Sequence, residues 1–203
     1  MKIICIGRNY ADHAKEMKAE VPTAPVFFMK PDTAILRDGY DFYFPDFTQD
    51  LHYECELVVR IDKVGKNISE KFAHKYYSDI TLGIDFTARD LQQQCKEKGL
   101  PWEIAKSFEH SAPISQKFIS VENLDLNNLT FELKKNSETV QVGHTSDMLF
   151  TIDKIIAYIS QFMTLKKGDL IFTGTPAGVG PVQIGDVLEG FLEGTKMYEF
   201  KVK

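Results

Sequence analysis

The chain has 203 residues, 43% of them hydrophobic, and a formal net charge of -5 at pH 7. A chain of this length can bury one sizeable core, and since no linker-like stretch interrupts it we expect a single domain over residues 1–203. Its basic residues are scattered along the chain, which argues against a nucleic-acid footprint or an anionic-membrane binder. The N-terminal apolar run is too short for a signal peptide and no run approaches a membrane span, so we expect a cytoplasmic protein.

Cysteine usage agrees with a reducing compartment. Cys5, Cys55 and Cys95 are an odd number, lie far apart and form no C-x-x-C. This pattern favours reduced, mostly buried thiols over disulfides or zinc ligands.

The first part of the chain contains short strands around one short helix. The helical pattern covers residues 10–17, and it places His13 and Glu16 on one face because they are three residues apart. An exposed charged helix is the alternative interpretation. Strands are expected at residues 2–6 and 25–31, the second bounded by prolines.

Aromatic residues crowd residues 39–48, G-Y-D-F-Y-F-P-D-F-T. This stretch fits either a strand against the core or an apolar patch covered by a second subunit. The sequence does not distinguish the two.

Residues 51–59, L-H-Y-E-C-E-L-V-V, predict a strand that becomes buried in its β-branched second half. Residues two apart in a strand project to the same face, so Glu54 and Glu56 stand side by side. Two carboxylates at the start of a buried strand repel each other and are penalised by desolvation unless a cation is present. Taken alone, the E-x-E spacing fits the wet face of an ordinary strand equally well.

A second chemistry-bearing region follows. Residues 80–86 predict a buried strand and residues 87–99 a helix, with Asp85 at the junction and either Asp85 or Thr87 as the expected N-cap. Further on, Lys106 lies in the apolar stretch P-W-E-I-A-K-S-F. A lysine there either extends to solvent or is retained for a reason.

The C-terminal half returns to strands. A hairpin is expected across Asn136-Ser137, and a glycine-rich loop, G-T-P-A-G-V-G-P, covers residues 174–181. This loop lacks the Gly-Lys-Ser/Thr of a nucleotide loop, and its free N–H groups suit a carboxylate or phosphate as well as a plain turn. The other expected elements are a helix at 151–163 and strands at 170–173, 187–192 and near the C-terminus.

Glu54, Glu56 and Asp85 supply only hard oxygen ligands, which favours Mg²⁺ or Mn²⁺, with Ca²⁺ possible, over zinc. Three monodentate carboxylates fill half an octahedron and leave positions for water and a bidentate 2-oxo acid. Such a site acts as a Lewis acid when negative charge develops on the keto oxygen.

Several motifs in order along almost the whole chain resemble the fumarylacetoacetate hydrolase superfamily, especially its small acylpyruvase and oxaloacetate decarboxylase members. They are G-R-N-Y-A-D-H-x-x-E-M, H-x-E-x-E, D-x-T-A-R-D-x-Q, G-L-P-W-x-x-A-K-S-F and G-D-L-I-F-T-G-T-P-x-G-V-G-P. Two departures touch no proposed ligand: Glu109-His110 follow K-S-F, and Ser137 occupies a turn position where glycine is common.

The resemblance implies an α+β, β-rich fold: a rolled mixed β-sandwich with a short N-terminal lid helix, forming a homodimer. It implies Mg²⁺ held by Glu54, Glu56 and Asp85. It also implies that three residues are catalytic: His13, Glu16 and Lys106. Four more residues would contact the substrate or support the site: Arg8, Arg89, Gln92 and Thr175.

The expected function is a metal-dependent enzyme that hydrolyses acylpyruvates and decarboxylates oxaloacetate. His13, oriented by Glu16, would activate water, and Lys106 would hold the substrate's anionic groups. An isomerase or tautomerase of an enolisable 2-oxo diacid is the alternative. A non-catalytic metal-binding relative is the alternative from a different class. We further expect residues 10–21 to bury little apolar surface and to be ordered by ligand.

Overall fold

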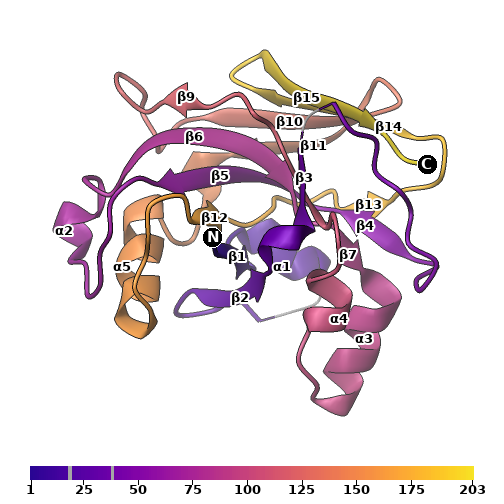
Figure 1. Cartoon of the computed structure of the whole chain (residues 1–203), viewed down its shortest axis with the longest axis horizontal. Helices are drawn as coiled ribbons and strands as arrows, with labels where there is room; N and C mark the ends of the chain where they lie inside the picture. The colour runs from indigo at the N-terminus through magenta and orange to yellow at the C-terminus, as the bar shows by residue number, and fades with distance from the viewer. Residues whose placement is uncertain (18–19, 38) are drawn as a thin grey trace.

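The computed structural model describes residues 1–17, 20–37 and 39–203, which form a β-rich mixed fold with a curled sheet (Figure 1). The helices are α1 (Ala11–Glu16), α2 (Glu70–Ala73), α3 (Arg89–Lys98), α4 (Glu103–Lys106) and α5 (Ile152–Phe162). The strands are β1 (Ile3–Gly7), β2 (Val26–Lys30), β3 (Ile35–Arg37), β4 (Leu51–Tyr53), β5 (Cys55–Ile61), β6 (Tyr77–Ile84), β7 (Thr87–Ala88), β8 (Ala112–Ile114), β9 (Ile119–Ser120), β10 (Thr130–Lys135), β11 (Glu138–His144), β12 (Leu170–Phe172), β13 (Gly180–Pro181), β14 (Val187–Leu192) and β15 (Thr195–Lys201).

The largest sheet has the order β2-β1-β12-β5-β6-β8-β3, with β9 also paired to β6. Its centre, β5, is buried along its length except at Arg60, as expected for a strand covered on both faces. β1 runs parallel to β12, whereas β5 is antiparallel to both β12 and β6. This order brings the ends of β1, β5, β6 and β12, which are distant in sequence, to neighbouring positions.

A second sheet, β11-β10-β14-β15, lies across β5 and β6 (Figure 1). Its first hairpin turns at Asn136 and Ser137, whose φ angles of 53° and 68° give the positive-φ pair of a two-residue hairpin turn. A third, small sheet has the order β13-β4-β7. The predicted hairpin and the predicted β-rich α+β class are confirmed.

α5 packs its apolar side inward. Ile152, Ile155, Ile156 and Ile159 are all buried, which follows from their helical spacing. The helix is capped by Thr151, whose side chain accepts a hydrogen bond from the Lys154 N–H.

The predicted cap of α3 is wrong. The helix begins at Arg89 after Ala88, and no side chain caps it, because Thr87 and Ala88 pair with β4 as strand β7. Asp85 lies farther back, and its carboxylate is used elsewhere. At the other end, Gly99 adopts φ +64° as the predicted helix stop.

The aromatic stretch at 39–48 packs only partly against the core, and its coverage by a second subunit stays a prediction. Phe42 is fully buried, forms an isolated bridge with Val202 and packs on Phe86 with ring centroids 4.3 Å apart. Tyr40 and Tyr43 are each 67% exposed. One aromatic residue therefore completes the core while its neighbours face solvent.

Two other expectations concern the cysteines and the membrane. Cys5, Cys55 and Cys95 are buried and free, as predicted. Within the part of the chain that the structure describes, every helix is too short or too polar to cross a membrane.

Replacing Phe42 by Ala should lower the free energy of unfolding by about 3–5 kcal/mol, because it empties a fully buried ring site beside Phe86. The matched change Tyr43→Ala removes an exposed ring and should alter it by less than about 0.5 kcal/mol. Urea unfolding of both variants measures the difference. Equal losses would mean that Phe42 is not part of the core.

Candidate active site

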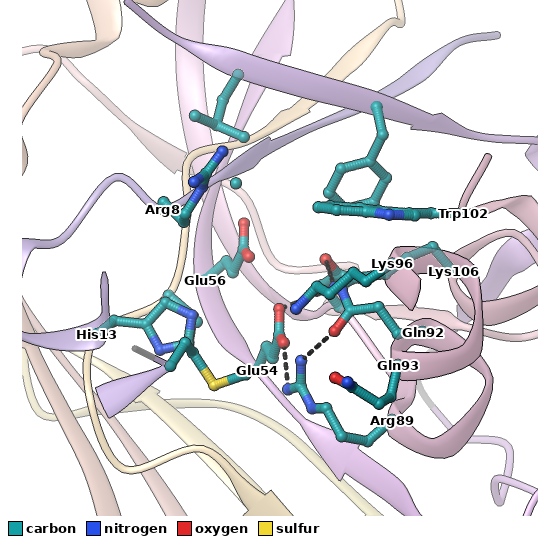
Figure 2. A pocket seen from close by; sticks show the side chains of 16 residues that line it. Arg8, His13, Glu54, Glu56, Arg89, Gln92, Gln93, Lys96, Trp102 and Lys106 are labelled. Atoms are coloured by element: carbon teal, nitrogen blue, oxygen red, sulfur yellow. Dashed lines mark hydrogen bonds and ion pairs between the residues drawn. The ribbon is translucent and has the colours of Figure 1, made fainter. Parts of the chain in front are cut away.

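A cavity of about 390 Å³ opens beside α3 and α4, and Figure 2 shows side chains from several elements converging on it. Nine of the ten residues predicted for the site line this cavity: Arg8, His13, Glu54, Glu56, Asp85, Arg89, Gln92, Lys106 and Thr175. The tenth, Glu16, does not line the cavity but interacts with His13, which does.

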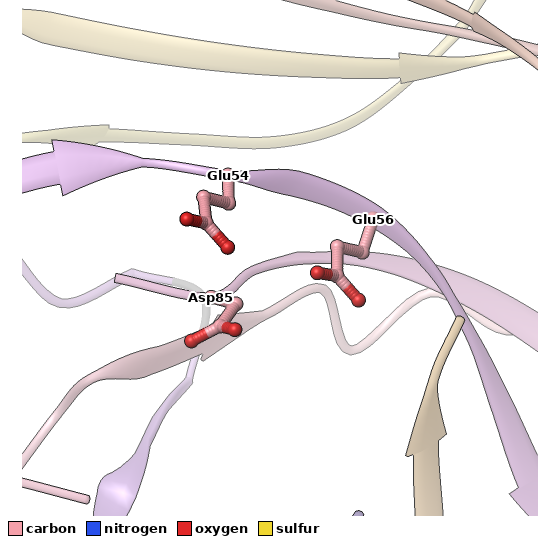
Figure 3. A group of neighbouring side chains, drawn as sticks. All are labelled: Glu54, Glu56 and Asp85. Atoms are coloured by element: carbon pink, nitrogen blue, oxygen red, sulfur yellow. The ribbon is translucent and has the colours of Figure 1, made fainter. Parts of the chain in front are cut away.

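The floor of the cavity contains the three predicted carboxylates (Figure 3). Glu54 lies between β4 and β5, Glu56 lies in β5, and Asp85 follows β6. The Asp85 N–H donates to the Glu54 carbonyl at 2.8 Å, which joins the two strand ends. One oxygen from each carboxylate lies within 4.8 Å of the others, and all three residues are buried.

Cations neutralise most of this buried negative charge. Lys106 Nζ donates to Glu54 at 2.9 Å and to Asp85 at 2.7 Å, and Arg89 donates to Glu54 at 2.6 Å. Lys106 is itself buried, so the predicted choice between extension to solvent and retention is settled in favour of retention. Glu56 differs: it accepts from the Gly174 N–H at 2.7 Å and has no ion pair among the described residues.

Lys30 is a third cation, which the sequence analysis did not identify. It lies at the end of β2 with its side chain fully buried, and its Nζ is 2.8 Å from Asp85 Oδ1. That contact lacks hydrogen-bond geometry, so this buried carboxylate oxygen accepts no hydrogen bond from the described residues. Lys30 instead donates to the carbonyls of Phe86 and Lys106 and to the Ser111 hydroxyl.

The pKa values of the carboxylates diverge. Burial acts to raise the pKa of Glu54, but the positive charges of Lys106 and Arg89 outweigh it and hold that pKa below its ordinary value. Burial raises the pKa of Glu56 well above its ordinary value, and the charges of Asp85 and Glu54 raise it further. Burial lowers the pKa of Lys106, yet Asp85 and Glu54 leave it raised overall.

The residues present fit a hard divalent cation. The donor set is three carboxylates, one of which has a buried oxygen without a hydrogen-bond donor and another of which has no ion pair among the described residues. Carboxylate-only sites suit Mg²⁺ or Mn²⁺ and do not select zinc. A cation here would also relieve the mutual repulsion that raises the pKa of Glu56.

The predicted lid helix is α1. Its His13 Nδ1 lies 3.2 Å from Glu16 Oε2, and the Glu16 carboxylate accepts from the Gly178 N–H at 3.1 Å. Tyr10 and Ala14 are buried, so the expectation that this segment buries little apolar surface is wrong for the described residues. Of the predicted mobile segment 10–21, Lys18 and Ala19 lie outside the described residues.

The segment that leads into α1 is fixed by Asn9, which is fully buried. Its side chain donates to the carbonyls of Phe150 and Thr173 and accepts from the Phe150 N–H. These bonds tie the segment before α1 to the end of β12.

The four residues expected at the substrate are placed around the cavity. Arg8 follows β1 with φ +59° and donates to the Glu20 carbonyl. Gln92 accepts from Arg89 at 2.8 Å. The Thr175 hydroxyl donates to the Cys55 carbonyl at 2.9 Å, so it braces the strand that carries the glutamates.

Four further residues of the site were not anticipated. Gln141 accepts from the Cys55 N–H and donates to Thr175, and the cavity wall includes Phe28, Lys96 and Trp102. Lys30 had a usable signal, since it ends an apolar strand much as Lys106 follows an apolar stretch. The others have ordinary sequence contexts.

Comparison with known proteins identifies the fold family. Residues 2–202 match the family model described as fumarylacetoacetate (FAA) hydrolase C-terminal. The chain belongs to the fumarylacetoacetate hydrolase family. This confirms the resemblance stated from the motifs.

Relatives within the fumarylacetoacetate hydrolase family have several named activities. A mouse protein named oxaloacetate tautomerase FAHD1, mitochondrial, is 47% identical over 202 residues, which are 99% of this chain and 91% of that protein. The structure of fumarylpyruvate hydrolase from Pseudomonas aeruginosa, in complex with Mn²⁺ and pyruvate, is 35% identical with a TM-score of 0.93, and covers 100% of this chain and 89% of that one. The structure of 5-carboxymethyl-2-hydroxymuconate delta-isomerase from Mycobacterium smegmatis is 33% identical with a TM-score of 0.87. The match covers 99% of this chain and 78% of that one.

Divalent-metal binding should release protons. Because the pKa of Glu56 is raised, the metal-free protein holds a proton there above the ordinary pKa, and a cation displaces it. Metal affinity should therefore increase with pH through this window, whereas the metal-free protein should lose stability as the pH rises through it. Calorimetry of Mg²⁺ binding in two buffers of different ionisation enthalpy measures the released protons.

Glu56→Gln should abolish this proton release and weaken Mg²⁺ binding. The matched control Glu138→Gln, at an exposed position of β11, should retain both. Unchanged proton release in the Glu56 variant would contradict the assignment.

Proposed function

We propose that this chain is a divalent-metal-dependent enzyme of 2-oxo acid chemistry, with keto–enol tautomerisation of oxaloacetate as its first candidate reaction. The observation that carries this proposal is the placement of His13 and three carboxylates on one cavity. From the sequence, an isomerase or tautomerase of an enolisable 2-oxo diacid is the alternative function. It moves to first place because relatives 46–47% identical bear that name.

Glu54, Glu56 and Asp85 would hold the cation, Mg²⁺ or Mn²⁺. When bound, it would supply Lewis acidity toward the keto oxygen of a chelated 2-oxo acid. The name of the Pseudomonas relative's structure, which contains Mn²⁺ and pyruvate, supports this role.

His13 is the proposed proton carrier. Glu16, near its Nδ1, orients the ring and leaves Nε2 as the basic atom, while Gly178 anchors Glu16 in turn. Nε2 would take the proton from the substrate carbon next to the keto group and return it to the keto oxygen, so no other reactant is required. His13 is nearly buried, which limits proton exchange with bulk water.

Lys106 is proposed to contact the anionic end of the substrate. In the structure described here it bonds to Glu54 and Asp85. A metal ion binding to those carboxylates would compete for the same oxygens and free Lys106 for the substrate's carboxylate. Arg8, Arg89, Gln92 and Thr175 are proposed to position the substrate or support the site.

The second candidate function is cleavage of C–C bonds, which would include both the hydrolysis of acylpyruvates and the decarboxylation of oxaloacetate. The His13–Glu16 pair favours it, because the same base could deprotonate a water that adds to the distal carbonyl. The name of the fumarylpyruvate hydrolase relative gives it further support. A non-catalytic metal-binding relative is less favoured, since ligands, base and lysine are all present.

We further propose a single catalytic domain over residues 1–203 and a homodimer. An apolar depression supports the dimer: the exposed Phe47 and Ile104 line it together with the half-buried Leu91 and Phe108. The predicted cytoplasmic location stays a prediction, because the mammalian relatives are named as mitochondrial proteins.

His13→Ala should lower the rate of enol-to-keto conversion of oxaloacetate by roughly 10²- to 10⁴-fold, the usual effect of losing a general base. Mg²⁺ affinity should be retained, since His13 is not a ligand. The control His144→Ala removes an exposed histidine and should be silent. The decay of enol absorbance, with Mg²⁺ or with chelator, is the measurement, and acetylpyruvate cleavage is followed in parallel.

Full activity with chelator would exclude the metal from the mechanism. Turnover of acetylpyruvate without catalysed tautomerisation would make hydrolysis the main reaction.

The dimer proposal is tested by Ile104→Asp. This change places a charge on the apolar depression and should halve the mass measured by light scattering. Ile184→Asp, at a 71% exposed position outside the depression, is the matched control. A monomeric wild type, or a dimer unaffected by Ile104→Asp, would contradict this surface as the interface.

A further inference from the structure

Lys96 is a cavity residue for which the proposed function provides no role. It projects from the last turns of α3 and lines the cavity with Trp102, whose ring centroid is 5.7 Å from its Nζ (Figure 2). It has no carboxylate partner among the described residues, and the same is true of Arg8 on the β1 side. The other two cavity cations, Arg89 and Lys106, are paired with Glu54.

The environment of Lys96 is cationic. Lys96 is exposed, but partial desolvation lowers its pKa and the charge of Arg89 lowers it further; Glu54 acts in the opposite direction, and Lys106 and Arg8 add smaller lowering effects. Lys96 and Arg8 face this cavity without carboxylate partners among the described residues, so an anion bound between them would be stabilised. The cavity therefore has a carboxylate floor and a cationic rim.

These two regions would bind opposite ends of one substrate. The 2-oxo acid end would lie on the carboxylate floor through the divalent cation. With that end held on the floor, a second carboxylate at the other end of the same substrate would lie toward the rim. There the cations without carboxylate partners are Lys96 and Arg8, with the apolar rings of Trp102 and Phe28 beside them.

We infer that Lys96, with Arg8, binds the second carboxylate of a dicarboxylic 2-oxo acid and so makes this enzyme select diacids over monocarboxylic acylpyruvates. The inference rests on the proposed function for the placement of the first carboxylate. A monocarboxylic substrate would leave the rim cations facing an uncharged group. A charge-assisted hydrogen bond is then missing, and selectivity of about tenfold or more follows.

The first test is a binding measurement that does not require turnover. N-oxalylglycine and N-ethyloxamate present the same chelating end and cannot enolise at carbon, but only the first has a second carboxylate. Calorimetry with Mg²⁺-loaded protein gives the ratio of their dissociation constants. Wild type should favour N-oxalylglycine by about tenfold or more, and Lys96→Met should reduce that ratio by about tenfold.

Two control variants separate a specific contact from general charge. Lys96→Arg keeps the cation and should keep most of the preference. Lys98→Met removes a charge from the same helix at an exposed position that does not line the cavity, and it should leave the ratio unchanged. Binding of N-ethyloxamate should be the same in all four proteins.

The second test uses oxaloacetate and its 4-methyl ester, which lacks the distal charge. Lys96→Met should raise KM for oxaloacetate about tenfold with little change in kcat, and should leave KM for the ester unchanged. If neither compound is turned over, the proposed function fails while the binding ratio still tests the rim.

The inference is overturned by any of three binding results. These are a wild type without preference for N-oxalylglycine, an unchanged ratio in Lys96→Met, or an equal loss for both ligands. An equal loss of affinity for both ligands would show that Lys96 maintains the shape of the cavity and does not contact the second carboxylate.

Discussion

The structure depends on keeping three buried carboxylates in one place. Ionised groups taken out of water are tolerated only when cations and hydrogen bonds surround them. The cations come from separate elements: Lys30 from β2, Arg89 from α3 and Lys106 from α4. The sheet edge and the α3–α4 pair must therefore close on the glutamate strand for the core to be stable. Once a divalent cation has displaced the proton of Glu56, three carboxylates face three cationic side chains and the cation, so the cluster would be positive and attractive to an anionic substrate.

Much of the fold could be predicted from local patterns. The apolar runs of β1, β5 and β6, the helical spacing of α5 and the Asn136-Ser137 turn each have one favourable local structure. The cap of α3 could not be predicted from local sequence, because Thr87 pairs with β4 as part of strand β7 and so does not cap the helix. The aromatic stretch was ambiguous for a similar reason: Phe42 is buried against Phe86 and Val202, both of which are distant in sequence. Long-range pairing decided both outcomes.

The parts of the candidate site that could be predicted are those formed by residues close together in the sequence or contained in the motifs of the family. The E-x-E spacing shows that Glu54 and Glu56 share a face, and the structure confirms it. Lys30 was missed because its role depends on β2 ending next to Asp85 and Phe86, which are distant in sequence and do not belong to a strand that pairs with β2. Lys96 was missed because a lysine in the last turn of a helix is ordinary, and only the cavity around it makes its charge notable.

The loop at 174–181 connects two parts of the site. Its Gly174 N–H holds Glu56, and its Gly178 N–H holds Glu16 on the lid helix. Gly174 has φ +99°, and a Cβ there would lie 2.6 Å from Asn9 Cβ, so its backbone has little room to shift. The loop thus works as a spacer of set length between the proposed base and the carboxylates. Substrates of different length cannot be accommodated by moving that side of the cavity, so any change in substrate range within this scaffold has to come from the opposite wall, on α3 and α4.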